Sequence, residues 1–173
     1  MKRYVLQILL VLAIAASAQG RVLVDQIGRT VEFAEPVTRV VSLAPSLTET
    51  SYEVGGGGTL VGATRYATFP EAAAKLPRVG TYVALDLEKI VSLRPQLCLA
   101  IKDGNPKASV ERLEALGIPV YVFDPKNLED VVDTVVRLGD IYRTEAQAAV
   151  LASDYRQRLA RVARQLEETK ERP

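Results

Sequence analysis

Residues 39–65 constrain the fold more strongly than any other part of the chain. They open with a short, β-branched apolar run at residues 40–44, which is typical of a buried strand in a parallel sheet. Ser46 and Glu49 then have the spacing of a capping box, so we expect a helix that begins at Ser46. The glycines at positions 55–58 end that helix, because glycine adopts the left-handed backbone of a helix terminus without a steric penalty.

A second apolar run follows the glycines, at residues 60–64, and predicts the next strand of the same sheet. Open α/β sheets bind ligands beyond the carboxyl ends of their strands. We therefore expect the residues that follow these two strands to lie on one rim, namely Ala44, Pro45, Ser46, Arg65 and Tyr66.

The rest of the chain continues the alternation of strand and helix patterns. Before the central unit, an alternating segment at residues 21–33 predicts a short hairpin. After it, Asp86 is expected to cap a short helix. Further strands are expected at residues 96–101 and 119–123, and further helices at residues 87–93, 107–116 and 127–142. This order predicts an α/β fold in which helices cover a mainly parallel sheet.

The last element is expected to be one long helix. Thr144 and Gln147 have the spacing of a second capping box, and no helix-breaking residue follows before Arg172. Such a helix spans roughly 40 Å, which is longer than a small domain needs. Its second half carries a narrow apolar stripe that needs a surface to pack against, made of Tyr155, Leu159, Val162 and Leu166.

The composition argues against several classes of function. The 173-residue chain has a net charge of +1 and shows no basic stripe, which disfavours a nucleic-acid binder. It has no histidine and a single cysteine, so the commonest general base and metal ligand is missing. It also lacks a Gly-Lys-Ser/Thr phosphate loop and a Gly-x-Ser-x-Gly nucleophile motif. We therefore expect no enzyme activity, no cofactor and no metal site.

The amino terminus has the pattern of a secretory signal. Lys2 and Arg3 precede an apolar run at residues 5–15, and a small-x-small cleavage pattern ends at Ala18. We expect residues 1–18 to be removed and the mature protein to be exported.

Two tyrosines and one acidic residue are the most informative single positions. Tyr66 and Tyr82 lie in irregular segments, where they either pack on the surface or grip a large planar ligand. Glu88 lies in the first turn of a predicted helix, where it complements the helix dipole or offers a docking charge to an arginine of a partner. Residues 102–104 form a polar loop at a strand end, with contact to a ligand as an open alternative.

Three segments resemble a known family. RVVSLAPSLTE, LVGATRYATFPEAA and PRVGTYVALDLEKIVSLRPQLCLA resemble the amino-terminal lobe of periplasmic substrate-binding proteins that serve ABC transporters for cobalamin, haem and iron-siderophores. The resemblance implies a three-layer α/β lobe at residues 19–143. It also implies that residues 144–173 form the rigid helix that joins two lobes in this family.

The resemblance also implies roles for matched residues. A corrinoid, haem or ferric-siderophore ligand would contact the cleft loops, through Ala44, Pro45, Ser46, Tyr66, Tyr82, Lys102, Asp103 and Gly104. Glu88 matches the acidic residue that pairs with arginines of the membrane permease, which would be the protein's only link to the membrane. Tyr82 stands where cobalamin-binding members have tryptophan, which leaves the ligand open.

Family members continue into a second lobe that is absent from this sequence. We therefore expect a truncated or split binding protein, with one wall of the ligand site. The alternative is a ligand-free interaction module that dimerises through its long helix; an exported enzyme is the least favoured class.

Overall fold

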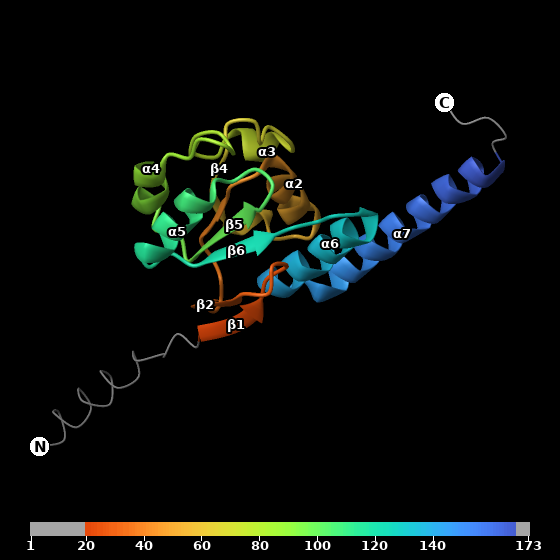
Figure 1. The fold of residues 1–173 in the computed structure, drawn as a ribbon, viewed down its shortest axis with the longest axis horizontal. Coiled ribbons are helices and arrows are strands. Elements are labelled where there is room, and N and C mark those ends of the chain that lie inside the picture. The colour runs from red at the N-terminus through yellow and green to blue at the C-terminus, as the bar shows by residue number, and fades with distance from the viewer. Residues whose placement is uncertain (1–19, 169–173) are drawn as a thin grey trace, which may run out of the picture.

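The protein forms one α/β lobe around a parallel sheet. The computed structural model describes residues 20–168, so the predicted signal peptide lies outside the described residues. Four parallel strands are ordered β4-β3-β5-β6 across the sheet (Figure 1). Their bounds are Val40–Ser42 for β3, Leu60–Ala63 for β4, Leu97–Ile101 for β5 and Val120–Phe123 for β6. The predicted α/β class with a parallel sheet is confirmed.

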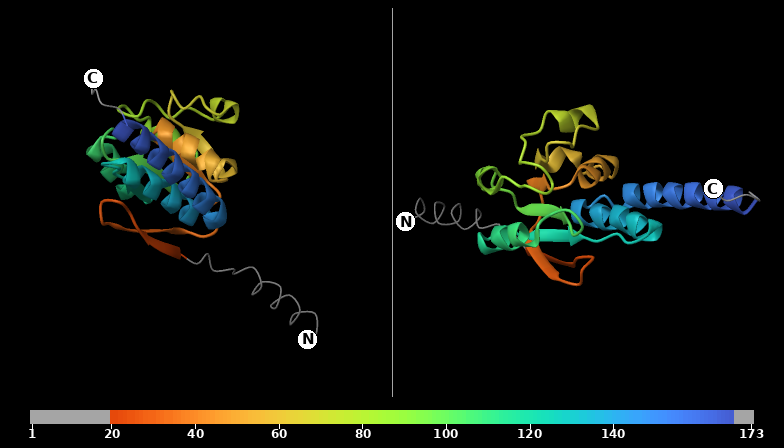
Figure 2. Two further views of the ribbon diagram at one scale, coloured as in Figure 1. Left: turned by 90° about the vertical axis from the view of Figure 1, so that its right-hand side faces the viewer. Right: turned by 45° about the horizontal axis from the view of Figure 1, so that its top comes forward.

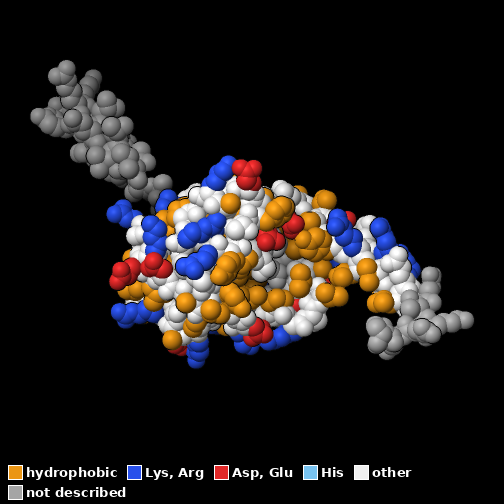
Figure 3. All heavy atoms as spheres, turned by 90° about the horizontal axis from the view of Figure 1, so that it is seen from above, with side chains coloured by type: hydrophobic (Ala, Val, Ile, Leu, Met, Phe, Trp, Pro, Cys, Tyr) orange, Lys and Arg blue, Asp and Glu red, His pale blue; other side chains and the backbone are white. Residues whose placement is uncertain are grey.

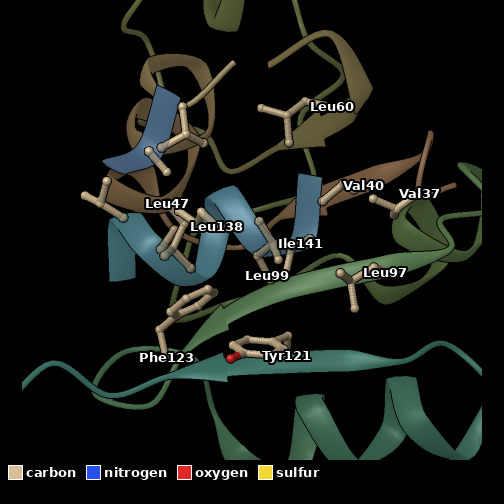
Figure 4. Packing of buried hydrophobic residues seen from close by; sticks show 14 of the residues in the cluster. Val37, Val40, Leu47, Leu60, Leu97, Leu99, Tyr121, Phe123, Leu138 and Ile141 are labelled. Atoms are coloured by element: carbon tan, nitrogen blue, oxygen red, sulfur yellow. The ribbon is translucent and has the colours of Figure 1, made fainter. Parts of the chain in front are cut away.

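Helices cover both faces of the sheet, because successive side chains of each strand point to opposite faces and pack into two separate cores. One core joins α4 and α5 to residues such as Val41 and Val120. The other joins α2, α6 and α7 to residues such as Leu99 and Phe123 (Figure 4). The helices are α2 (Pro45–Glu53), α3 (Glu71–Ala74), α4 (Leu87–Ser92), α5 (Lys107–Ala115), α6 (Leu128–Tyr142) and α7 (Glu145–Glu168), with a short 3-10 turn η1 (Gly57–Thr59) before β4.

The amino-terminal hairpin protects an edge of the sheet. Its strands β1 (Gly20–Val24) and β2 (Thr30–Ala34) pair antiparallel, as predicted. The connecting turn lies beside β6, where the Gln26 amide donates to the Val122 carbonyl at 3.1 Å. The Arg29 guanidinium donates to the Val120 carbonyl at 2.9 Å. The hairpin therefore satisfies backbone groups of an edge strand that would otherwise be free to pair with another chain.

Both predicted capping boxes are wrong. α2 begins one residue early, at Pro45, whose fixed φ suits the first helical position, and no side chain caps it. The Thr144 hydroxyl is buried without a hydrogen-bond partner, and the Gln147 side chain instead donates to the Glu53 carbonyl at 2.8 Å. At Gln147, a hydrogen bond to a residue distant in the sequence forms in place of the predicted helix cap. The predicted cap at Asp86 is confirmed, since its carboxylate accepts from the Lys89 amide at 2.9 Å.

The long helix α7 packs antiparallel on α6 and runs on beyond it (Figure 2). The first half of its predicted apolar stripe has a surface to pack on, since Tyr155 and Leu159 contact the core. The second half remains open, because Val162 is 52% exposed and Leu166 67% exposed. The helix is described to Glu168, and its predicted extension to Arg172 lies outside the described residues. Within residues 20–168, no helix combines the length and apolar character needed to cross a membrane.

Candidate functional site

The four parallel strands end on the same side of the sheet and bring their following loops to one rim (Figure 1). The loop after β4 carries Arg65 and Tyr66, and the loop after β5 carries residues 102–104. The start of α2 follows β3, and Asp124 follows β6. The sequence-predicted positions after these strands therefore lie at one end of the fold.

Backbone hydrogen bonds join residues 77–80 to the end of β4, and this places Tyr82 near the loop that follows β4. The Ala63 amide donates to the Pro77 carbonyl at 3.0 Å, and the Val79 amide donates back to the Ala63 carbonyl at 3.1 Å. The Arg65 amide then donates to the Gly80 carbonyl at 2.8 Å. Residues 77–80 therefore run beside β4, so the loop with Tyr66 and the turn with Tyr82 leave from neighbouring positions.

Tyr82 stands at the tip of a tight turn. The Thr81 amide donates to the Ala84 carbonyl at 2.9 Å, and the Ala84 amide donates to the Thr81 hydroxyl at 3.0 Å. This closure leaves Tyr82 40% exposed and Val83 56% exposed. The Tyr82 ring lies so close to Gly104 that an added Cβ would come within 2.5 Å of it. The structure thus brings Tyr82 together with the loop after β5.

Tyr66 is the more exposed of the two tyrosines, at 63%. Its loop is fixed by Arg78, whose guanidinium donates to the carbonyl of Thr64 at 3.1 Å and to that of Ala67 at 3.0 Å. Phe69, in the same loop, is 65% exposed. The sequence reasoning missed Phe69, although an aromatic residue three positions after Tyr66 in an irregular segment could have indicated it.

A buried asparagine ties three parts of the rim together. The Asn105 side-chain amide donates to the Leu43 carbonyl at 2.9 Å and to the Tyr82 carbonyl at 2.7 Å. Its side-chain oxygen accepts from the Ile101 amide at 2.8 Å. Asn105 is only 6% exposed. No local pattern distinguished it in the sequence, because two of its three partners come from other loops.

The rim near β5 and β6 carries paired charges. The Asp124 carboxylate lies 2.8 Å from the Lys102 ammonium and 2.7 Å from the Lys126 ammonium. Hydrogen bonds from these two lysines lower the pKa of Asp124. Of the other predicted residues, Ser46 and Asp103 are exposed and Pro45 and Gly104 are half-buried. The Ala44 side chain is buried at 3% exposure, so it offers no side-chain surface to a ligand.

Glu88 is not part of these loops and lies in the first turn of α4. It is exposed, and no ion pair engages it within the described part of the chain. Its position is compatible with either of its two expected roles.

Apolar side chains gather across the middle of the face that carries the loops between β4 and α4 (Figure 3). This face is suited to a ligand with a large apolar surface, because exposed aromatic rings provide contact area with little loss of side-chain entropy. Residues 20–168 contain no group of three or more histidine, cysteine or acidic side chains that could hold a metal ion. Cys98 is buried, and this burial raises the pKa of its thiol to about 12, so the thiolate needed for nucleophilic chemistry does not form near neutral pH.

Comparison with known proteins identifies relatives with these elements. The family described as periplasmic binding protein matches residues 40–173. The vitamin B12-binding protein of Photorhabdus laumondii is 37% identical over 141 residues, which cover 82% of this chain and 51% of the relative. The vitamin B12-binding protein of Vibrio vulnificus is 40% identical over 127 residues, covering 73% of this chain and 46% of the relative.

Two solved structures share the fold. The periplasmic vitamin B12 binding protein BtuF of Vibrio cholerae superimposes with a TM-score of 0.72 at 33% identity, covering 77% of this chain and 52% of that protein. A periplasmic heme binding protein of Pseudomonas aeruginosa superimposes with a TM-score of 0.69 at 32% identity, covering 73% of this chain and 46% of that protein. The chain thus spans about half the length of the relatives it matches.

Proposed function

Because the chain belongs to the periplasmic binding protein family, and resembles its cobalamin- and haem-binding members, we propose that it contributes one wall of a binding site for a corrinoid, haem or similar metal-chelate ligand. The observation that carries this proposal is that Tyr66 and Tyr82 are both exposed on loops near the carboxyl ends of the strands. The hydrogen bond from the Arg65 amide to the Gly80 carbonyl joins the two loops. A binding role needs none of the catalytic groups that the sequence lacks.

Several further features belong to the same proposal. Export to the periplasm through a cleaved signal at residues 1–18 agrees with the location named for the relatives. Residues 19–143 act as the ligand-binding lobe, and the helix described from Glu145 to Glu168 leads away from it. A wall on one side buries only part of a large ligand, so the affinity of this chain alone is weak compared with a site that encloses its ligand.

The two tyrosines provide the direct test. We expect Tyr66→Ala and Tyr82→Ala each to weaken binding of cyanocobalamin or haemin by about 5- to 30-fold, since loss of an exposed aromatic contact costs about 1–2 kcal/mol. Binding is measured by the shifts of rim amide signals in an NMR titration, which detects weak complexes. Leu116→Ala serves as the control, because Leu116 is 49% exposed but lies just before β6, at the opposite end of the sheet. Equal losses in all three variants, or titration shifts far from the rim, would count against the proposed wall.

For Glu88 we propose docking to the permease of an ABC importer through arginines of that partner. Glu88→Arg reverses the charge at an exposed position, so it should weaken association with the permease complex and leave the tyrosine-dependent ligand shifts unchanged. Association is measured by surface plasmon resonance on permease in nanodiscs. Glu111→Arg is the control, because Glu111 is an exposed glutamate on α5 whose one ion pair among the described residues is with Lys107 in the same helix. Undiminished association of the Glu88 variant would refute the docking role.

A further inference from the structure

The charges of the rim are distributed unevenly. On the side of β5 and β6, Lys102 and Lys126 both pair with Asp124. Asp103 lies close enough to Lys126 to raise its pKa further. Two cations therefore face two carboxylates, and this side of the rim is electrically balanced.

The side of β4 is different. The Arg78 guanidinium donates hydrogen bonds to the backbone carbonyls of Thr64, Ala67 and Ala74. In the neighbouring helix α3, Lys75 pairs with Glu71 at 3.0 Å. Arg65 is exposed, and none of the hydrogen bonds or ion pairs found among residues 20–168 involves its side chain. Of these three cations, Arg65 is the one whose side chain has neither a hydrogen-bond partner nor an ion-pair partner among residues 20–168.

We propose that Arg65 binds an anionic oxygen group, a carboxylate or a phosphate, at the edge of a planar ligand that rests on Tyr66 and Tyr82. This inference rests on the proposed function and adds the charge of the ligand to it. A guanidinium presents its donors in a planar fork that matches both carboxylate and phosphate oxygens. The Arg65 backbone is fixed by its hydrogen bond to Gly80, so the side chain starts from a defined position beside Tyr66.

The surroundings of Arg65 explain why it would favour a ligand with a negatively charged edge. The neighbouring surface is aromatic and apolar, because the rings of Tyr66 and Phe69 are both exposed. A large ligand on this surface excludes water from the arginine, and a charged hydrogen bond strengthens as water is removed. A neutral or cationic edge at the same place leaves the guanidinium unpaired. Anionic ligands are therefore favoured over cationic ligands of the same shape.

Two pairs of soluble probes test the proposal on the full chain. Coproporphyrin I carries four carboxylates, and tetrakis(N-methylpyridyl)porphine carries four positive charges on a similar ring. Cyanocobalamin has a phosphodiester, and dicyanocobinamide lacks it. The two porphyrins test whether binding depends on carboxylates of the ligand. The two corrinoids test whether it depends on a phosphate. Each is titrated by NMR against the wild type, Arg65→Gln and the control Arg112→Gln, since Arg112 is an exposed arginine on α5.

We expect Arg65→Gln to weaken coproporphyrin binding by about fivefold to tenfold, the usual effect of losing one charge-assisted hydrogen bond. The cationic porphine should bind the variant as well as or better than the wild type, and Arg112→Gln should change neither. Binding of the anionic probes that does not depend on Arg65, with the tyrosine effects intact, would overturn this inference alone. If none of the four probes shifts the rim signals of the wild type, the proposed function fails and this inference fails with it.

Discussion

Replacing Asp25 by alanine will lower the free energy of unfolding by about 2–4 kcal/mol, because the change removes a buried carboxylate and leaves the backbone amides that donate to it without their partner. Asp25 is 3% exposed, and its carboxylate accepts from the amides of Ile27 at 3.1 Å and Arg29 at 2.8 Å. It also accepts from the Arg29 Nε at 2.9 Å and from the Val122 amide at 3.4 Å. One side chain therefore closes the hairpin turn and attaches it to the edge of β6.

Urea unfolding followed by circular dichroism measures this loss. Asp25→Asn keeps one carbonyl oxygen and the side-chain volume, so we expect a smaller loss of about 1–2 kcal/mol. Glu32→Ala, an exposed change in the same hairpin, should stay within about 0.5 kcal/mol of the wild type. If Asp25→Ala and Glu32→Ala have the same midpoint, the hairpin does not contribute to the stability of the sheet.

Asn105→Ala will destabilise the protein by about 2–4 kcal/mol and will loosen the turn that carries Tyr82. The change removes three hydrogen bonds and leaves the Leu43 carbonyl and the Ile101 amide without partners, each at a cost of about 1 kcal/mol or more. The Tyr82 carbonyl is released as well. Amide hydrogen exchange at residues 81–84 should become faster, and ligand shifts at the rim should weaken.

Two variants sharpen this prediction. Asn105→Asp keeps an oxygen for the Ile101 amide but places a carboxylate against two carbonyl oxygens, which disfavours the charged form in the folded state. The folded-state pKa of the new carboxyl is thus raised, so the variant should gain stability as the pH falls from 7 towards 4. Asn127→Ala removes a single helix-cap bond to the Asp130 amide and should cost only about 1 kcal/mol. An Asn105→Ala loss no larger than that of Asn127→Ala would contradict the role assigned to Asn105.

Local sequence patterns were sufficient for the order of the elements and for the placement of Tyr66 after β4, at the rim of the sheet. The apolar run at residues 40–44 and the run at residues 60–64 predicted parallel strands because burial on both faces requires continuous apolar residues. The position of Tyr66 followed from this, since the carboxyl ends of parallel strands share one side of a sheet. The cap at Asp86 also followed from local chemistry.

The capping boxes failed for a reason that local patterns do not contain. A serine or threonine three residues before a glutamate or glutamine is only a possible cap, and the rest of the fold decides which contact forms. At Ser46 the preceding proline already occupied the first helical position. At Gln147 the carbonyl of Glu53, 94 residues earlier, was the partner that formed.

The sequence by itself determined the fold class, because hydrophobic periodicity and helix-ending glycines report which segments become strands and helices. Only the tertiary structure decided which loops meet and which charges remain unpaired. Asn105 reaches Leu43 across 62 residues and Asp25 reaches Val122 across 97, and such partners are chosen by packing. The same packing pairs Lys102 with Asp124 and leaves Arg65 beside Tyr66 without a counter-charge.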